Sequence, residues 1–234
     1  MAILKNLGTA YKALVIGSNG AIGGALLEAL QGDPDCTLVV GISRSSEISI
    51  DITNEESIQK ASSDLESKGP FDLIILATGI LHQAQIVPEK KLDHLNMDYL
   101  QKVFAINTFG PALVIKHFHR LLSKKRSLFV CVSAKVGSIE DNRLGGWYSY
   151  RASKAALNML IKTAGIEIRR THPETTVVAL HPGTVKSRLS QPFGGEKTGQ
   201  VPQDAAHKML LALGQVPETS QSIFLSYDGS TIPW

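Results

Sequence analysis

A tyrosine and a lysine four positions apart, Tyr150 and Lys154, form the pair in this sequence best suited to proton transfer. On a helix, residues i and i+4 share a face, so the ammonium group of the lysine would lie beside the phenol. A nearby positive charge favours the phenolate, and we expect it to lower the Tyr150 pKa from its usual value of about 10. The pair therefore predicts a proton donor that works near neutral pH.

A glycine-rich turn follows the first apolar run of the chain. The segment from Gly17 to Gly24 reads GSNGAIGG, and a helical pattern comes directly after it. Glycine permits a positive φ and lets a pyrophosphate approach the backbone, while amide groups at the start of the next helix face the phosphates. A glycine-rich hairpin is the alternative, but the order strand, turn, helix favours dinucleotide binding. The predicted contacts are Gly17, Ser18, Asn19, Gly20, Ile22 and Gly23.

The spacing of apolar residues predicts the elements that carry these motifs. Short β-rich runs without polar alternation indicate parallel strands that are covered on both faces. They are 13–16, 38–42, 71–76, 128–132, 177–180 and 223–225, and helical patterns lie between them near 21–31, 54–67, 97–122, 149–170 and 203–213. At the second helix, Thr53 followed by Glu56 predicts a capping box. The alternation predicts an α/β fold, a single-domain Rossmann-type doubly wound parallel sheet flanked by helices.

The chain shows no linker, internal repeat or low-complexity tract, so residues 1–234 are expected to form one dinucleotide-binding domain. Two irregular stretches, 78–96 and 182–202, each follow a predicted strand. In such sheets ligands bind beyond the carboxyl ends of the strands. The glycines at 194, 195 and 199 suggest that part of the second stretch, near 186–202, closes as a substrate lid. Two long surface loops are the other interpretation.

Composition excludes several classes of protein. Hydrophobic residues make up 43% and charged residues 19% of the 234, which is typical of a globular protein. The net charge of +3 disfavours a nucleic-acid partner, and no uncharged stretch reaches the roughly 20 apolar residues of a membrane span. The two cysteines are expected to be free thiols, no secretory signal is recognisable, and a cytoplasmic location is expected. The seven histidines have no spacing that predicts a metal site.

Arg44 indicates which nicotinamide cofactor to expect. It follows the second predicted strand, where an acidic residue would bind the ribose hydroxyls of NAD and an arginine accommodates the 2′-phosphate of NADP. No Asp or Glu appears until Glu47, and Ser43 and Ser45 offer further donors beside the guanidinium. A solvated arginine is the alternative. The sequence predicts NADP(H) in preference to NAD(H).

Three further segments complete a pattern around the Tyr-x-x-x-Lys pair. Asn107 begins an Asn-x-x-Gly motif, Ser133 follows the apolar run FVCV, and His181 opens the segment HPGTVKS. Together with the glycine-rich turn, these motifs resemble the short-chain dehydrogenase/reductase family over nearly the whole chain. The resemblance implies hydride transfer between a nicotinamide and a carbonyl or alcohol carbon.

The resemblance also implies a role for each matching residue. Tyr150 would donate the proton, Lys154 would hold the nicotinamide ribose, Ser133 would bind the substrate oxygen, and Asn107 would hold a water in a proton relay behind Lys154. The other cofactor contacts it implies are Asp51, Ile52, Ala77, Thr78, Gly79, Pro182, Gly183, Val185 and Ser187.

Three segments depart from the family's pattern. After the third strand the family often has Asn-Asn-Ala-Gly where this chain has Ala77-Thr78-Gly79, and we expect cofactor binding to persist there. Ala21 stands where much of the family has the middle glycine of the turn, and we expect the turn to survive the added methyl group. The family's catalytic serine commonly lies three residues before a glycine, a position that Ala134 takes here before Gly137. Adjacent strand residues point to opposite faces. Ser138 is therefore a second candidate for the role of Ser133, and a hydrogen bond to the backbone is the alternative for Ser133 itself.

Within the family, the segments around 137–139 and 145–154 are similar to a narrower group, the C-factor-like cell-signalling proteins and the Sniffer-type carbonyl reductases. Two functions follow. One is NADPH-dependent reduction of an aldehyde, ketone or quinone to an alcohol; the other is a nucleotide-binding signalling role with weak or lost reductase activity. The intact Asn107, Tyr150 and Lys154 favour the enzyme, because a binding module needs no proton relay.

Expectations about the substrate and the assembly complete the sequence-based predictions. Leu144, Trp147 and Phe193 suggest an apolar pocket for a small carbonyl or alcohol substrate. The helices near 97–122 and 149–170 carry more apolar residues than one core stripe needs, and family members commonly pair through them. The chain is therefore expected to form a homodimer or homotetramer.

Overall fold

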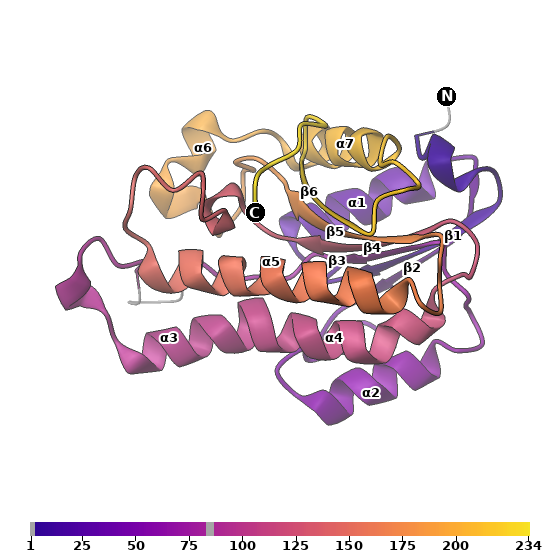
Figure 1. Ribbon diagram of the computed structural model, residues 1–234, viewed down its shortest axis with the longest axis horizontal. Helices are drawn as coiled ribbons and strands as arrows, with labels where there is room; N and C mark the ends of the chain where they lie inside the picture. The colour runs from indigo at the N-terminus through magenta and orange to yellow at the C-terminus, as the bar shows by residue number, and fades with distance from the viewer. Residues whose placement is uncertain (1–2, 83–86) are drawn as a thin grey trace.

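Six parallel strands form one sheet in the order β2-β1-β3-β4-β5-β6 (Figure 1). The computed structural model describes residues 3–82 and 87–234. The strands are β1 (Tyr11–Ile16), β2 (Cys36–Ile42), β3 (Leu73–Leu76), β4 (Ser127–Val132), β5 (Thr175–His181) and β6 (Ser222–Ser226). All six predicted strands are present. Every residue of β3 and β4 is buried, as expected for strands covered on both faces.

The helices also follow the sequence pattern. They are α1 (Ala21–Gln31), α2 (Glu55–Asp64), α3 (Met97–Phe104), α4 (Gly110–Phe118), α5 (Tyr148–Ile168), α6 (Gly195–Thr198) and α7 (Pro202–Leu213). The predicted helix over 97–122 is divided by a π-helical turn (Ala105–Phe109), and the four-residue α6 was not predicted. None of the described helices combines the length and apolarity that crossing a bilayer requires.

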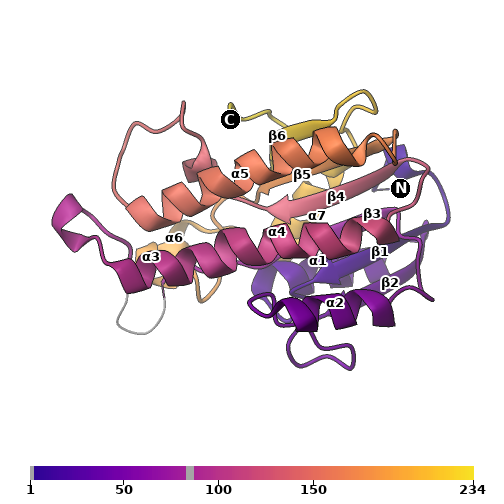
Figure 2. The same ribbon diagram turned by 60° about the horizontal axis from the view of Figure 1, so that its bottom comes forward.

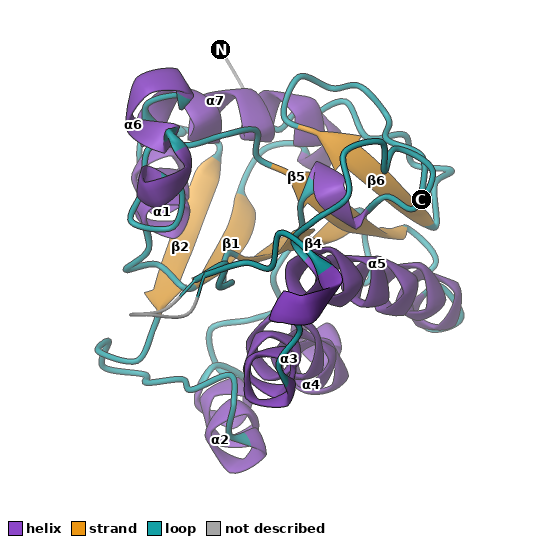
Figure 3. Ribbon diagram, turned by 90° about the vertical axis from the view of Figure 1, so that its left-hand side faces the viewer, coloured by secondary structure: helices purple, strands orange, loops and turns teal. Residues whose placement is uncertain are grey.

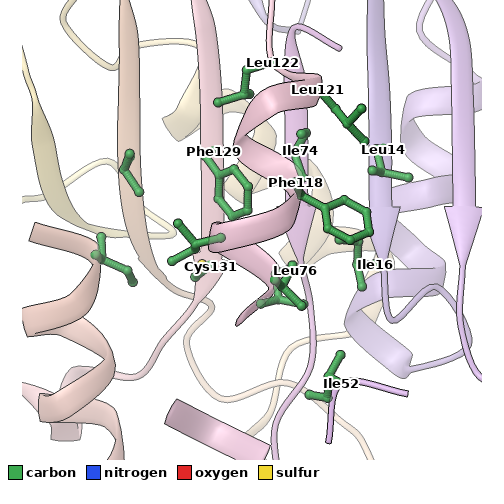
Figure 4. Close-up of a cluster of buried hydrophobic side chains, with 14 of the residues drawn as sticks. Leu14, Ile16, Ile52, Ile74, Leu76, Phe118, Leu121, Leu122, Phe129 and Cys131 are labelled. Atoms are coloured by element: carbon green, nitrogen blue, oxygen red, sulfur yellow. The ribbon is translucent and has the colours of Figure 1, made fainter. Parts of the chain in front are cut away.

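The elements form three layers, with the sheet in the middle (Figures 2 and 3). Helices α1 and α7 pack together on one face, and α2, α3, α4 and α5 cover the other. On the second face, apolar side chains of β1, β3 and β4 meet those of α4 (Figure 4), namely Leu14, Ile16, Ile74, Leu76, Phe118 and Phe129. Burying a side chain of this size stabilises the fold by about 1.5–3 kcal/mol relative to leaving it exposed.

The chain reverses its direction of winding at β1. From this strand it first crosses to β2 on one side, and it later returns to β3 on the other side. The connections therefore leave a crevice between β1 and β3 at their carboxyl ends, which is where open α/β sheets bind ligands. This arrangement confirms the predicted doubly wound fold.

The start of α2 differs from the prediction. The residue that caps the helix is Asn54, whose side chain accepts a hydrogen bond from the Ser57 N–H at 3.0 Å. The hydroxyl of Thr53 donates instead to Asp51 Oδ1 at 2.7 Å. The predicted capping box at Thr53 is therefore wrong by one residue, because the carboxylate of Asp51 competes for the threonine hydroxyl.

Candidate active site

A crevice of about 760 Å³ opens at the carboxyl edge of the sheet. Its walls come from the segments that follow β1, β2, β3, β4 and β5, so residues far apart in sequence meet there. The predicted site residues that line it are Asn19, Gly20, Ile22, Arg44, Ala77, Thr78, Gly79, Ser133, Tyr150, Lys154, Pro182, Gly183, Val185 and Ser187. The predicted residues outside the lining are Gly17, Ser18, Gly23, Ser43, Asp51, Ile52 and Asn107.

The glycine-rich turn is shaped by close backbone packing. Gly17 has φ +90°, and a Cβ there would lie 2.8 Å from the Ala77 carbonyl oxygen. A Cβ on Gly23 would lie 2.2 Å from the Gly17 carbonyl oxygen, so no side chain fits between helix and turn. Ala21 is the first residue of α1, which explains how the turn accommodates it. The turn leaves the amide groups at the start of α1 beside the crevice, as a pyrophosphate site requires.

The loop after β2 places Arg44 at one end of the crevice. Its serines fold the loop on itself, because the Ser46 hydroxyl donates to the Ser43 carbonyl at 2.9 Å and the Ser45 N–H donates to the Ser43 hydroxyl at 3.2 Å. The Asn19 amide of the glycine-rich turn donates to the Ser45 hydroxyl, which ties the two segments together. Arg44 is exposed, and within residues 3–82 and 87–234 its guanidinium forms no ion pair, although its charge contributes to the lowered pKa of Asp51. This end of the crevice can therefore accept an anion.

Asp51 and Ile52 lie behind this loop. Hydrogen bonds from the Thr53 N–H and hydroxyl stabilise the Asp51 carboxylate and lower its pKa. Ile52 is buried against the start of α4, where a Cβ on Gly110 would lie 2.5 Å from the Ile52 carbonyl oxygen. In this structure the two residues support the crevice from outside its lining.

Tyr150 and Lys154 lie side by side in the first two turns of α5, on the floor of the crevice. The Lys154 Nζ lies 6.0 Å from the centroid of the Tyr150 ring and donates to the Val132 carbonyl oxygen at 2.9 Å. Burial lowers the pKa of Lys154 to about 8. The pairing predicted from the i, i+4 spacing is therefore present.

The predicted lowering of the Tyr150 pKa is wrong for this structure. Burial, with the neighbouring Tyr99 as a smaller cause, raises the pKa of Tyr150 above its ordinary value. The reason is that Lys154 directs its proton to the Val132 carbonyl, while the phenol loses the solvation that would stabilise its anion. Tyr150 is consequently protonated at neutral pH.

Asn107 lies in the π-helical turn between α3 and α4 and is fully buried. Its side-chain amide forms two hydrogen bonds with the backbone of Ile80: the oxygen accepts from the Ile80 N–H at 2.8 Å, and the nitrogen donates to the Ile80 carbonyl oxygen at 2.9 Å. The amide nitrogen also donates to the Ser153 hydroxyl at 3.2 Å. A Cβ on Gly79 would lie 3.5 Å from both Asn107 Oδ1 and Lys154 Nζ. The π-helical turn thus holds the loop after β3 beside Lys154. Turns of this kind are common at functional sites.

The serines at the end of β4 already have partners. The Ser133 hydroxyl donates to Asn158 Oδ1 at 2.7 Å, and the Ser138 hydroxyl accepts from the Asp141 N–H at 3.2 Å outside the crevice lining. Ala134 belongs to the apolar cluster of Tyr150, and Val136 from the same segment packs against that cluster. Ser133 and Ala134 both line the crevice. The partner of the Ser133 hydroxyl is a side chain, so the alternative of a backbone hydrogen bond for Ser133 is wrong.

An apolar cluster forms the other end of the crevice. Trp147 packs edge-on against Phe193 and Tyr150, with ring centroids 5.2 Å and 6.2 Å apart. Trp147 and Phe193 were expected in an apolar pocket, but Leu144 is 92% exposed and lies outside it. Sequence reasoning missed Leu81 and Leu189, which join the cluster from irregular segments with no periodicity to indicate them.

The crevice also holds polar atoms that no protein group satisfies. Within the described residues, Thr78 Oγ1 and His181 Nδ1 are buried without a hydrogen-bond partner. Leaving such atoms unpaired costs free energy. Both belong to residues of the lining, so the chain offers a bound cofactor hydrogen-bonding positions in addition to the space that Gly79 leaves open.

The charged side chains that line the crevice are all basic. Arg44, Lys135, Lys154 and Arg188 line the crevice and no carboxylate does, although every Asp and Glu of the chain lies within the described residues. A crevice of this kind attracts an anionic ligand. The donor set therefore fits a nicotinamide dinucleotide. No cluster of three or more His, Cys, Asp or Glu side chains in residues 3–82 and 87–234 is arranged to hold a metal.

Two curated relatives resemble this chain over most of their length. The 1-hydroxy-2-glutathionyl-2-methyl-3-butene dehydrogenase of a Rhodococcus species is 30% identical over 187 residues, which are 79% of this chain and 78% of the relative. The C-signal protein of Myxococcus xanthus is 32% identical over 168 residues, 71% of this chain and 94% of that protein.

Solved structures share the fold. The NADPH-bound carbonyl reductase from chicken fatty liver has a TM-score of 0.82 at 23% identity and covers 97% of this chain and 95% of its own. The carbonyl reductase Sniffer of D. melanogaster also has a TM-score of 0.82, at 21% identity, and covers 96% of this chain and all of its own. The sequence model of the short chain dehydrogenases matches residues 12–197. With the glycine-rich turn, the Tyr150–Lys154 pair and the parallel sheet all in place, the chain belongs to the short-chain dehydrogenase/reductase family of oxidoreductases.

Proposed function

We propose that the protein reduces an aldehyde, ketone or quinone to an alcohol with NADPH. The observation that carries this proposal is the Tyr150–Lys154 pair on the floor of a crevice that also holds the glycine-rich turn. One end of the crevice suits an anionic dinucleotide and the other is apolar, so a carbonyl compound placed at the apolar end would meet Tyr150 between the two.

Tyr150 acts as the proton donor to the carbonyl oxygen. Its raised pKa keeps the phenol protonated at neutral pH, which is the form that reduction requires. Lys154, with a pKa of about 8, is mostly protonated at the same pH, and its charge offsets the negative charge that develops on the phenol oxygen as the proton leaves. The nicotinamide, when bound, supplies the hydride.

Ser133 and Asn107 complete the proposed machinery. For Ser133 to bind the substrate oxygen, its hydroxyl must exchange Asn158 for the substrate, which a rotation about one side-chain bond can achieve. Asn107 fixes the loop beside Lys154 through Ile80, and we place the water of the proton relay next to these two groups.

NADP(H) is the proposed cofactor in preference to NAD(H). Arg44 stands at the end of the crevice where the 2′-phosphate would lie, and Ser45 beside it contacts the glycine-rich turn through Asn19. No carboxylate lies in the lining to repel the phosphate. We place the substrate at the apolar end under a lid formed by residues 186–202, whose two ends are joined by paired hydrogen bonds between Lys186 and Gln200 and between Gln200 and Thr184.

The test is direct. NADPH deuterated at its transferable position is incubated with the protein and a panel of aldehydes, ketones and quinones, and the products are analysed by mass spectrometry. Deuterium on the former carbonyl carbon of an alcohol product is the expected result. Binding of NADPH without a deuterated product from any member of a broad panel would contradict the proposal.

That negative result would favour a second candidate, a nucleotide-binding signalling role with weak or lost reductase activity. The identity of 32% to the protein named C-signal supports it, as does Ala134 at the position where the family commonly has serine. The intact Tyr150–Lys154 pair favours the enzyme.

We also propose that two or four copies of the chain associate through α4 and α5. Several large apolar side chains on or next to these helices are exposed, among them Phe109 (57%), Met159 (64%) and Ile166 (49%). Covering such side chains drives association. Light scattering at micromolar concentration is expected to give the mass of a dimer or tetramer, and a monomer would contradict this assignment.

A further inference from the structure

Glu89 is a buried carboxylate that the proposed chemistry does not use. It follows the loop after β3 and is 1% exposed; Asp33 is the other buried carboxylate in the described part of the chain. A carboxylate is expensive to bury unless it accepts hydrogen bonds. The groups that satisfy Glu89 therefore indicate what it does.

Within the described residues, the partner of the Glu89 carboxylate is Ser149 in the first turn of α5. One carboxylate oxygen accepts the Ser149 N–H at 3.2 Å, and the other accepts the Ser149 hydroxyl. The Glu89 carbonyl oxygen accepts the Trp147 N–H at 2.5 Å. The residue at the helix start, Trp147, makes no side-chain cap of its own. Glu89 thus caps α5 from a distant segment, and its negative charge lies at the positive end of a 21-residue helix.

The backbone that leads into α5 also contacts the main chain of Glu89. Gly145, Gly146 and Trp147 have consecutive positive φ values of 63°, 65° and 52°. A left-handed conformation is unfavourable for tryptophan and persists only where neighbouring groups hold it. The Trp147 N–H, which donates to the main-chain carbonyl oxygen of Glu89, is such a hold. A side-chain substitution at Glu89 leaves this carbonyl in place, so the Glu89 carboxylate adds a second and separate hold at Ser149.

Two residues of the crevice lining lie at the start of α5, beside the Glu89 contacts. Trp147 belongs to the apolar wall of the crevice, and Tyr150 follows Ser149 in the chain. Lys154 lies one turn further along and has its own anchor at the Val132 carbonyl oxygen. Movement at the start of α5 would therefore displace Trp147 and Tyr150 while Lys154 and the glycine-rich turn keep their places.

We propose that Glu89 is a positioning residue, whose buried carboxylate holds the start of α5 so that the Tyr150 phenol and the Trp147 indole face the substrate end of the crevice. The proposal rests on the proposed function insofar as Tyr150 donates the proton. Small misplacement of a catalytic group lowers the turnover rate strongly. Loss of Glu89 is therefore expected to lower kcat with little effect on NADPH binding.

The variants are Glu89→Ala and the nearly isosteric Glu89→Gln, which keeps one acceptor and removes the charge. The matched control is Asp33→Asn, because the Asp33 carboxylate is also buried but accepts from the Tyr11 hydroxyl at 2.8 Å, at the opposite edge of the sheet. We expect kcat to fall at least about tenfold in Glu89→Ala and less in Glu89→Gln. The dissociation constant of NADPH should stay within about twofold of wild type, and Asp33→Asn should keep its kcat.

A second readout is independent of turnover. In a Trp234→Phe background, the fluorescence of the protein reports on Trp147 alone. Both Glu89 variants should make this tryptophan more accessible to acrylamide, whereas Asp33→Asn should not. If Glu89→Ala does not fold, Glu89→Gln still decides the question.

Unchanged quenching of Trp147 in the Glu89 variants, or an equal loss of kcat in Asp33→Asn, would overturn the positioning role. A loss of NADPH binding together with kcat would also overturn it, because the effect would then extend to the whole crevice. If the wild type reduces no carbonyl compound while the Glu89 variants still expose Trp147, the proposed function fails and the positioning role of Glu89 stands.

Discussion

Lys154→Met exchanges a buried ammonium group for an apolar side chain of similar length, and the stability difference between the two proteins should depend on pH. Lys154 is 2% exposed, donates to one backbone carbonyl at 2.9 Å, and forms no ion pair within the described residues. Burial therefore disfavours its charged form and lowers its pKa from 10.5 to about 8.

The numbers of protons bound by the folded and the unfolded chain decide whether stability rises or falls with pH. Between pH 8 and 10.5 the unfolded chain holds a proton on Lys154 that the folded chain has released, so the free energy of unfolding rises with pH in this window. A pKa lowered from 10.5 to about 8 corresponds to about 3–4 kcal/mol at most. Methionine does not titrate, so this contribution is missing from the variant. Buried groups with raised pKa values, such as Tyr150 and Cys131, lower the free energy of unfolding as pH rises, but they do so in both the wild type and the variant.

The assay is urea unfolding of both proteins at intervals from neutral pH to about pH 10, with the free energy extrapolated to water. The wild type should gain stability relative to Lys154→Met as pH rises above 8, by no more than about 1.4 kcal/mol per pH unit. A difference that stays flat would show that Lys154 is solvated. A difference that falls would show that an anion stabilises its charge, and either result would refute the reasoning from burial.

Three further substitutions test other parts of the crevice. Arg44→Ala should weaken NADPH binding about ten- to a hundredfold and leave NADH binding within a few-fold, as measured by titration, because hydrogen bonds to charged groups contribute about 1.5–3 kcal/mol; equal losses would refute the 2′-phosphate contact. Gly23→Ala should destabilise the protein by about 1–3 kcal/mol in thermal unfolding, since the new Cβ would lie 2.2 Å from the Gly17 carbonyl oxygen, and an unchanged melting temperature would contradict this. Ser133→Ala should lower kcat/KM at least about tenfold, with partial recovery in Ser133→Ala/Ala134→Ser; unchanged kinetics in the single variant would exclude Ser133 from substrate binding.

The strands of the sheet could be predicted from the sequence because each one is marked by neighbouring residues of the chain. Strands such as β4 are buried on both faces and appear as continuous apolar runs. The glycines of the first turn indicate that backbone segments pack closely against one another there. The split of the 97–122 helix could not be read in the same way. In the π-helical turn the Asn107 side chain bonds to Ile80, a partner 27 positions away in the chain, which no local pattern indicates.

The same distinction applies to the site. The spacing of Tyr150 and Lys154 placed the two side chains together, but the pKa of the phenol depends on burial by segments that no local pattern connects to it. Glu89 gave no signal at all, because it reads as one charged residue in an irregular stretch until the fold brings it to the start of α5. Sequence patterns therefore located the candidate catalytic groups, and the structure was needed for their pKa values and for the residues that hold them in place.

NADPH oxidation by the wild type and by Tyr150→Phe, measured across a panel of aldehydes, ketones and quinones, decides whether Tyr150 is the proton donor of a carbonyl reductase. Tyr148→Phe is the matched control, because it lies two positions earlier on the same helix and outside the lining of the crevice. Turnover by the wild type and by Tyr148→Phe, with loss of at least about a hundredfold in Tyr150→Phe, is the predicted result. Turnover that persists in Tyr150→Phe would contradict the assignment of Tyr150 as the proton donor.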